Sequence, residues 1–369
     1  MTPFVILSLL IVLFHSAVAQ QNSTACDVQC SYEEDLQETN CDSRQFESIP
    51  IECSQSTYLS LRFNQIAEIE PGIFRDFLHL ERLILSHNNI YQINANTFNG
   101  AYQLEVIDLT YNHIHTFNRD ALNGTENLLS IDLGKNNLSS IEEGTFQLAL
   151  NLKIIDLSSN HLTYLSPAVF QDLKSIKNIF LNNNKLVDLP EDIFKDQSSL
   201  IYLDLANNLL SSLPRDIFKN LVQINILDLD ANRLMAITFT LPTILSLKLR
   251  DNELKHLGNA SIENWTGRVG NLYLEGNPWA CNCSFEPFRS FRFRVSPYCD
   301  IRDNPVCASP LVLVNQSLKN VNQTCPLQNI SSTTEVTNVG GRNGHISEHS
   351  RYSFFALLLP LGIVFYYLW

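Results

Sequence analysis

Residues 59–66 read LSLRFNQI, residues 83–90 read LILSHNNI, and residues 107–114 read IDLTYNHI. All three fit one pattern, L-x-L-x-x-N-x-L with isoleucine allowed for leucine, and this pattern continues as far as residues 247–254, LKLRDNEL. Its asparagine recurs every 24 residues, at Asn64, Asn88, Asn112, Asn136, Asn160, Asn184, Asn208 and Asn232, and then less regularly at Asn252 and Asn277. A fixed period of this length indicates a chain built from stacked repeats.

Each position of the repeat has a physical task. The two apolar residues of L-x-L alternate with outward-facing residues and predict a short strand. The asparagine follows in a tight turn, and we expect its amide to bond the backbone of its own and the neighbouring coil, because an unpaired buried amide costs about 1–3 kcal/mol. Phenylalanine keeps the same period on the other side of the repeat, at Phe74, Phe98, Phe146, Phe170, Phe194 and Phe218, with Leu122 in register.

This pattern resembles the leucine-rich repeat. The resemblance implies an α/β-type solenoid that is mostly β, a right-handed horseshoe of about ten repeats with a parallel sheet on its concave face and disulfide-capped ends. The convex side should hold loops and short turns, since Pro167, Pro190 and Pro214 would interrupt a long helix.

The repeats divide the chain into six expected segments. These are a signal peptide over 1–19, a cysteine-rich N-terminal cap over 20–55, leucine-rich repeats over 56–277, a cysteine-rich C-terminal cap over 278–325, a polar stalk with the attachment region over 326–353, and a hydrophobic C-terminal propeptide or membrane tail over 354–369. All nine cysteines lie in the two caps, as expected for an oxidising compartment.

The four N-terminal cysteines resemble the N-terminal cap of extracellular leucine-rich-repeat proteins. They are Cys26, Cys30, Cys41 and Cys53, and the pattern departs from the family at Tyr32, where a cysteine is usual, and at the additional Cys53. Four cysteines allow three pairings. We expect the pairs Cys26–Cys41 and Cys30–Cys53.

Residues 277–283, NPWACNC, resemble the start of the C-terminal cap of the same proteins. The resemblance implies the pairs Cys281–Cys307 and Cys283–Cys325, which leaves Cys299 over. An intermolecular disulfide, a free thiol and a buried or alternatively paired thiol all stay open for it. No histidine neighbours the C-x-C motif, so no metal site is expected there.

The first segment predicts secretion. Phe4 to Phe14 is apolar except for Ser8 and too short to span a bilayer, and residues 17–19, AVA, supply the small residues of a cleavage site. We expect cleavage after Ala19, with a retained membrane anchor as the alternative. Nine N-x-[ST] sequons agree with a secreted glycoprotein. Asn282 is expected to be unmodified, which leaves Asn22, Asn123, Asn137, Asn259, Asn264, Asn315, Asn322 and Asn329.

The last segment predicts a lipid anchor. Residues 354–369, FFALLLPLGIVFYYLW, are apolar and follow a polar spacer and a cluster of small residues, which is the order of a glycosylphosphatidylinositol (GPI) attachment signal. Asn343 or Gly341 is the expected attachment point, and a short single-pass anchor is the alternative. The net charge of −13 disfavours nucleic acid and anionic lipid as partners.

The outward residues of the strands form the predicted ligand-binding face. Five aspartates make an acidic column: Asp108, Asp132, Asp156, Asp204 and Asp228. Two aromatic residues, Phe180 and Tyr202, interleave with this column. Lys248, Arg250 and Tyr273 follow at its C-terminal end. The column predicts a basic, extended protein partner. Alternatively, aspartate is common at this position across the family and reflects the repeat itself. The two rings, expected to be exposed, are the stronger candidates for dominant contacts.

No catalytic constellation emerges from the sequence. His87, His113 and His161 flank ladder asparagines, so we expect no enzyme, cofactor or metal. The resemblance implies a cell-surface adhesion molecule or co-receptor that binds a protein ligand or receptor through its concave face. The alternative is a secreted innate-immune or matrix-associated binding protein. A homodimer, which Cys299 could lock, stays open.

Overall fold

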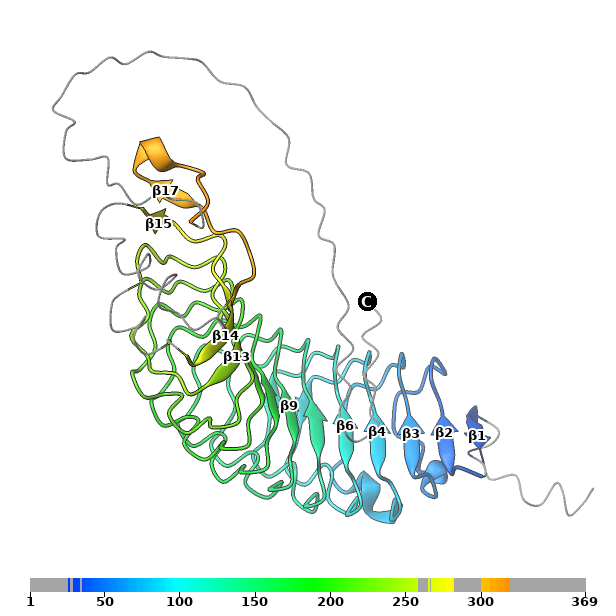
Figure 1. Cartoon of the computed structure of the whole chain (residues 1–369). Coiled ribbons are helices and arrows are strands. Elements are labelled where there is room, and N and C mark those ends of the chain that lie inside the picture. The colour runs from blue at the N-terminus through cyan, green and yellow to red at the C-terminus, as the bar shows by residue number, and fades with distance from the viewer. Residues whose placement is uncertain are drawn as a thin grey trace, which may run out of the picture. The chain divides into compact units, whose positions relative to one another are not determined.

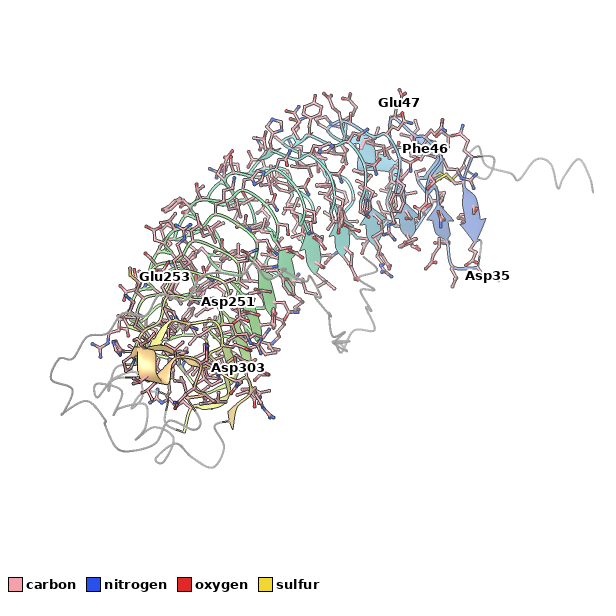
Figure 2. All side chains as sticks on the ribbon, turned by 90° about the horizontal axis from the view of Figure 1, so that it is seen from above. Asp35, Phe46, Glu47, Asp251, Glu253 and Asp303 are labelled. Carbon is pink, nitrogen blue, oxygen red and sulfur yellow. A yellow bond between two sulfur atoms is a disulfide. The ribbon has the colours of Figure 1, made fainter. Side chains whose placement is uncertain are left out.

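A computed structural model of the chain describes residue 26 and residues 29–33, 35–257, 265, 267–281 and 300–318. Within these residues thirteen short strands form one sheet that follows the inner curve of a solenoid (Figures 1 and 2). In sheet order they are β1 (Ser31–Glu33), β2 (Glu38–Asn40), β3 (Tyr58–Ser60), β4 (Arg82–Ile84), β6 (Val106–Asp108), β8 (Ser130–Asp132), β9 (Ile154–Asp156), β10 (Asn178–Phe180), β11 (Tyr202–Asp204), β12 (Ile226–Asp228), β13 (Ile244–Lys248), β14 (Val269–Tyr273) and β16 (Asp300–Ile301). The predicted solenoid is confirmed.

The other elements are short. Two-stranded sheets are formed by β5 (Gln92–Ile93) with β7 (Thr116–Phe117), and by β15 (Trp279–Ala280) with β17 (Cys307–Ser309). Three 3-10 turns, η1 (Ile51–Cys53), η2 (Ile73–Asp76) and η4 (Leu311–Leu313), lie outside the main sheet. No helix of the described residues is long and apolar enough to cross a membrane.

Parallel pairing in strict register follows from the repeat period. From β2 to β16 every neighbouring pair in the main sheet is parallel, whereas β1 pairs antiparallel with β2. Residues 24 positions apart therefore lie side by side, as Asp108 does with Asp132 and Phe180 with Asp204. A column of residues read from the sequence is thus a physical row across the concave face.

The asparagine ladder is confirmed in detail. Each ladder asparagine is between 3% and 7% exposed. Asn88 donates from Nδ2 to the carbonyl of Leu85 in its own coil at 3.0 Å and to that of Leu61 in the preceding coil at 2.8 Å, while its Oδ1 accepts the N–H of Ile66 at 3.0 Å. One side chain therefore ties two coils together and satisfies backbone groups that have no strand partner.

Phenylalanine rings fill the interior behind the sheet. Phe146, Phe170, Phe194 and Phe218 are at most 1% exposed and stack on one another with centroid distances of 6.2–6.5 Å. Leu122 takes this position in its coil and is 2% exposed. The core is thus one continuous column of apolar side chains, which no single coil could close.

The N-terminal disulfides differ from the predicted pairs. The structure joins Cys26 to Cys53 and Cys30 to Cys41, so the expected pairs Cys26–Cys41 and Cys30–Cys53 are wrong. The cause is the antiparallel β1–β2 pair: Ser31 lies opposite Asn40, which places the adjoining Cys30 and Cys41 beside each other.

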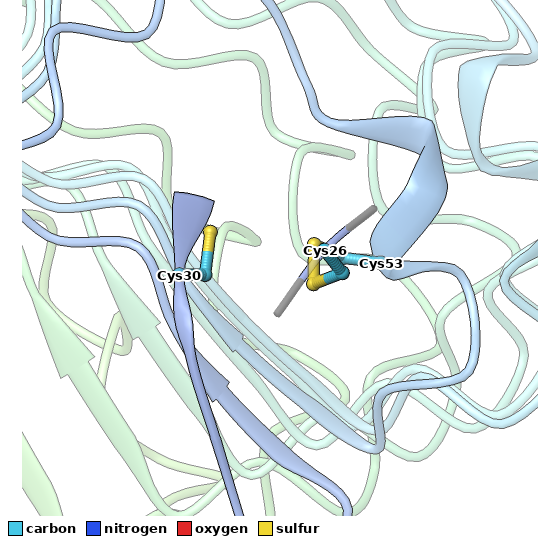
Figure 3. Close-up of side chains that lie close together, drawn as sticks. All are labelled: Cys26, Cys30 and Cys53. Carbon is cyan, nitrogen blue, oxygen red and sulfur yellow. A yellow bond between two sulfur atoms is a disulfide. The ribbon is translucent and has the colours of Figure 1, made fainter. Parts of the chain in front are cut away.

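Three of these sulfur atoms converge. Those of Cys26, Cys30 and Cys53 lie within 4.8 Å of one another (Figure 3). Each belongs to a disulfide in this structure. Cysteine binds metal as a thiolate, and a disulfide offers no thiolate. We therefore interpret this cluster as a covalent closure of the N-terminal cap.

At the other end, the implied Cys281–Cys307 disulfide is confirmed. The bond closes the cap where β15 runs beside β17. Cys283, Cys299 and Cys325 lie outside the described residues. So do the predicted signal peptide, the GPI-attachment region and tail, and the sequons at Asn22, Asn259, Asn264, Asn282, Asn322 and Asn329.

Candidate ligand-binding face

The predicted binding residues lie on the concave sheet, but their exposure is not what the sequence suggested. Asp132, Asp156 and Asp228 are only 8%, 6% and 6% exposed. The other predicted positions, Asp108, Phe180, Tyr202, Asp204, Lys248, Arg250 and Tyr273, are half-buried. Strands about 4.8 Å apart let each side chain cover the next, so the column is a packed row with little free carboxylate surface.

The aspartates also accept hydrogen bonds from the backbone of their own turn. Oδ1 of Asp108 accepts the N–H of Thr110 at 2.9 Å, and Asp132 accepts the N–H of Gly134 at the same distance. The same bond to the residue two positions on recurs at Asp156, Asp204 and Asp228. This repeated turn bond gives the aspartates a structural task in every coil that carries one. It favours the alternative in which the acidic column reflects the repeat.

Crowding of these carboxylates changes their proton affinity. Burial, and then the carboxylates of Asp156 and Asp108, raise the pKa of Asp132 well above its ordinary value, against the N–H of Gly134. Burial and then Asp228 raise the pKa of Asp204 to about 7, although the N–H of Ala206 and the ammonium of Lys248 lower it. The concave face is therefore less negative at neutral pH than the count of aspartates implies.

We expect the row to make stability depend on pH. The raised pKa of Asp204 means that the folded chain holds a proton that the unfolded chain releases near its ordinary value of about 4. The stability from this group is thus fully present below about pH 4 and is lost as the pH rises through about 7. Asp204→Asn keeps an oxygen for the Ala206 N–H and removes the charge. It should raise the unfolding free energy at pH 8 by about 1–2 kcal/mol and leave it unchanged at pH 4.

Urea unfolding at pH 4, 6 and 8 would measure the effect. Asp188→Asn provides the control, because Asp188 is exposed and lies outside the row. A loss of stability at pH 8 in the Asp204 variant alone would contradict the assignment.

The cations at the C-terminal end are already engaged. Lys248 Nζ lies 2.6 Å from Asp228 Oδ2. Burial lowers the pKa of Lys248, but Asp228, Asp230 and Asp204 together outweigh that effect and the net direction is upward. Arg250 donates from Nε to Asp303 Oδ2 at 3.2 Å and lies 3.5 Å from Asp230. These two cations pair with the protein's own carboxylates, so their charges are already balanced within the fold.

Asp303 connects the C-terminal cap to the sheet. Its Oδ2 also accepts the N–H groups of Leu274 and Glu275 at 2.7 and 2.9 Å, directly after β14. The Arg250 guanidinium lies 4.2 Å from the centroid of the Tyr273 ring. Figure 2 shows Asp303 at the C-terminal end of the solenoid. Sequence reasoning missed this residue, because 53 positions separate it from Arg250 and no repeat relates them.

One pair of rings remains as a contact candidate at the centre of the sheet. The Phe180 and Tyr202 centroids lie 5.4 Å apart, and Tyr202 donates its hydroxyl to Asp204 Oδ2 at 3.3 Å. Burial first, and then the charge of Asp204, raise the pKa of Tyr202, so the phenol stays protonated. The pair offers a half-buried aromatic surface with one polar edge, a composition enriched in protein interfaces.

The described sequons leave this sheet free. Asn123 is half-buried, and Asn137 and Asn315 are exposed, and all three lie outside the strands. Glycans at these positions would leave the Phe180–Tyr202 surface unoccupied.

Comparison with known proteins agrees with the repeat assignment. The sequence model described as leucine rich repeat matches residues 55–114, 79–138, 102–150, 126–186 and 175–234. SLIT and NTRK-like protein 4 of Mus musculus is 30% identical over 91 residues, which are 24% of this chain and 11% of that protein. The matched region is thus about a tenth of that relative's length.

Solved structures share the fold. A chain of the octameric complex of Latrophilin 3, Unc5D and FLRT2, in which FLRT2 is the LRR component, aligns with a TM-score of 0.63 and 21% identity over 80% of this chain and 99% of that chain. A chain of the mouse RP105/MD-1 complex aligns with a TM-score of 0.64 and 20% identity over 77% and 53%. Together with the asparagine ladder and the disulfides at both ends, these matches show that residues 55–234 are leucine-rich repeats and that the described residues fold as a leucine-rich-repeat solenoid with disulfide-bonded caps.

Proposed function

We propose that this chain is a cell-surface recognition protein, an adhesion molecule or co-receptor, that binds a protein ligand through the concave face of its repeats. The observation that carries the proposal is the half-buried Phe180–Tyr202 pair at the centre of a long parallel sheet whose strands carry no sequon. Repeat solenoids use such curved sheets as extended binding surfaces. The solved relatives named above come from protein complexes, which supports a protein partner.

The geometry changes which residues should dominate binding. Interface energy concentrates in a few aromatic and arginine side chains that lose water on binding. Asp132, Asp156 and Asp228 are too buried to make large contacts. The contact centre is therefore the ring pair with the half-buried Asp204, and Asp156 and Asp204 lie beside Phe180 on the two neighbouring strands.

The test uses the full chain displayed on cells. Proximity labelling with the wild-type chain on its expressing tissue would first identify the partner. The double variant Phe180→Ala and Tyr202→Ser should then lower partner labelling by about tenfold or more, since each residue of an interface centre contributes upward of about 1–2 kcal/mol.

The control variant is Tyr164→Ala, which removes a ring that is 55% exposed and lies outside the strands. Antibody staining of surface chain would show that all variants fold and reach the membrane. Partner labelling that survives the double variant would refute concave-face binding.

Secretion and membrane attachment of the chain are a separate part of the proposal. Cleavage after Ala19 and lipid attachment at Asn343 or Gly341 remain predictions from residues outside the described part. Release of surface chain by a phosphatidylinositol-specific phospholipase is the expected result. Retention after treatment would favour the single-pass anchor, and chain found only in the medium would favour the secreted binding protein.

A further inference from the structure

We propose that the rim of the first four repeats carries a second contact surface, which binds a partner segment presenting a carboxylate beside an apolar side chain. The surface consists of Phe63, His87 and Tyr111 with Arg62 and Lys135, and we call it the aromatic rim. The inference rests on the protein-binding function proposed above but does not require the Phe180–Tyr202 surface.

The rim is defined by one backbone position. From Asn64 to Asn252, the residue directly before the ladder asparagine has φ between 51° and 57°. In chain order these residues are Phe63, His87, Tyr111, Lys135, Ser159, Asn183, Asn207, Ala231 and Asp251. Left-handed backbone disfavours bulky side chains. The last five members of the column are small or short and polar, whereas the first three are large rings. The turn alone does not require these rings, so they need another explanation.

The three rings form a continuous stack across the coils. Phe63 and His87 have centroids 4.4 Å apart at 20°, and His87 and Tyr111 have centroids 4.3 Å apart at 11°. Stacking of the rings is favourable. The side chains of Phe63 and Tyr111 nevertheless remain 53% and 40% exposed to solvent. A group of neighbouring exposed rings on a protein surface is typical of a contact site.

Two cations complete the aromatic rim. The Arg62 guanidinium lies over the Phe63 ring at 5.5 Å, and the Lys135 ammonium lies over the Tyr111 ring at 5.9 Å. Burial first, and then Arg62, lower the pKa of His87, against the opposing effect of Asp108. The central ring is therefore neutral at neutral pH. Asp108 is half-buried, and its Oδ1 is held by the N–H and hydroxyl of Thr110.

The stacked rings and the two cations determine which kind of partner the aromatic rim can bind. Stacking and the two cations occupy the faces of the rings, so solvent meets mainly ring edges, which carry the positive part of the aromatic quadrupole. Edges favour carboxylate and carbonyl oxygens and the sides of apolar groups, and the exposed cations attract the same carboxylates. A sugar would need a free ring face, and a basic segment would be repelled.

The test is site-specific photo-crosslinking on cells. Phe63→p-benzoylphenylalanine and Tyr111→p-benzoylphenylalanine, each in the full chain displayed on cells in contact with the expressing tissue, keep a ring in the stack. The substitution at Tyr164, 55% exposed, gives the background, and that at Phe180 reports on the concave face. The crosslinked peptides are sequenced by mass spectrometry.

The expected result is crosslinks from positions 63 and 111 to a protein segment that contains aspartate or glutamate beside an apolar residue. Adding Arg62→Glu and Lys135→Glu should lower their yield by about tenfold. Lys185→Glu changes an exposed cation that directly follows the ladder asparagine Asn184 and lies outside the aromatic rim, and it should leave the yield unchanged.

Other outcomes overturn the aromatic rim as a binding surface. They are crosslinks to a basic segment, to a glycan or to a second copy of this chain, a yield insensitive to the two charge reversals, or a yield no greater than at position 164. Crosslinks at position 180 with background yield at 63 and 111 would remove the rim and keep the concave proposal. The opposite pattern would remove the concave proposal and keep the rim, and background yield at all three positions would remove both.

Discussion

Asn88→Ala is expected to destabilise the solenoid by about 3–5 kcal/mol. The change removes bonds to the carbonyls of Leu61 and Leu85 and to the N–H of Ile66, and these backbone groups belong to two different coils. Each polar group left buried without a partner costs about 1–3 kcal/mol, and water has little access because Asn88 is 4% exposed. The denaturant midpoint of unfolding, followed by circular dichroism, measures the loss.

The neighbouring residue supplies a matched control. Asn89→Ala changes the same side chain one position later, where it is exposed and no side-chain bond ties it to another coil. Its effect should stay within about 0.5 kcal/mol. Equal effects of the two substitutions would mean that the ladder contributes no more than ordinary surface asparagine, and the account of how the coils are joined would fail.

The strands, the ladder and the inward phenylalanines could all be predicted from the sequence. Each occupies a fixed place in a 24-residue period, and parallel pairing in register turns that period directly into columns. Leu59, Leu83 and Ile107 occupy adjacent positions of the sheet for this reason. Where the same local interaction recurs in each coil, one repeat supplies the geometry of the next.

The caps could not be predicted in the same way, because they break the period. Pairing of Cys30 with Cys41 depends on the antiparallel β1–β2 pair, which the repeat pattern does not predict. The contact between Arg250 and Asp303 likewise joins the sheet to a segment with its own chain path. In both places the outcome depends on long-range geometry that spacing does not encode.

The candidate site was predicted in position but not in exposure. The sequence placed Asp132 and Asp156 on the concave face, and they do lie there. Whether such a side chain meets solvent depends on its neighbours one strand away on each side, and on bonds such as that from the Gly134 N–H. The aromatic rim was missed, although its signal was present as Phe63, His87 and Tyr111 directly before three successive ladder asparagines.

Phe170→Ala should cost about 3–5 kcal/mol, the usual range for truncating a fully buried phenylalanine. Phe170 is 0% exposed and stacks between Phe146 at 6.5 Å and Phe194 at 6.2 Å, so removing its ring opens a cavity that both neighbours line. Phe170→Leu should cost only about 1–2 kcal/mol, because the interior already accommodates a leucine at this position in the Leu122 coil.

The central location of Phe170 adds a second expected result. In a stack where each coil contacts only its neighbours, a weak central coil uncouples the two flanks. Urea unfolding of Phe170→Ala should therefore broaden or split into two transitions, while Phe170→Leu should keep a single transition. Hydrogen exchange should show faster opening on both sides of residue 170 in the alanine variant. A single sharp transition at a merely lower midpoint would mean that the coils are coupled mainly through the asparagine ladder, and that the ring column adds stability without adding cooperativity.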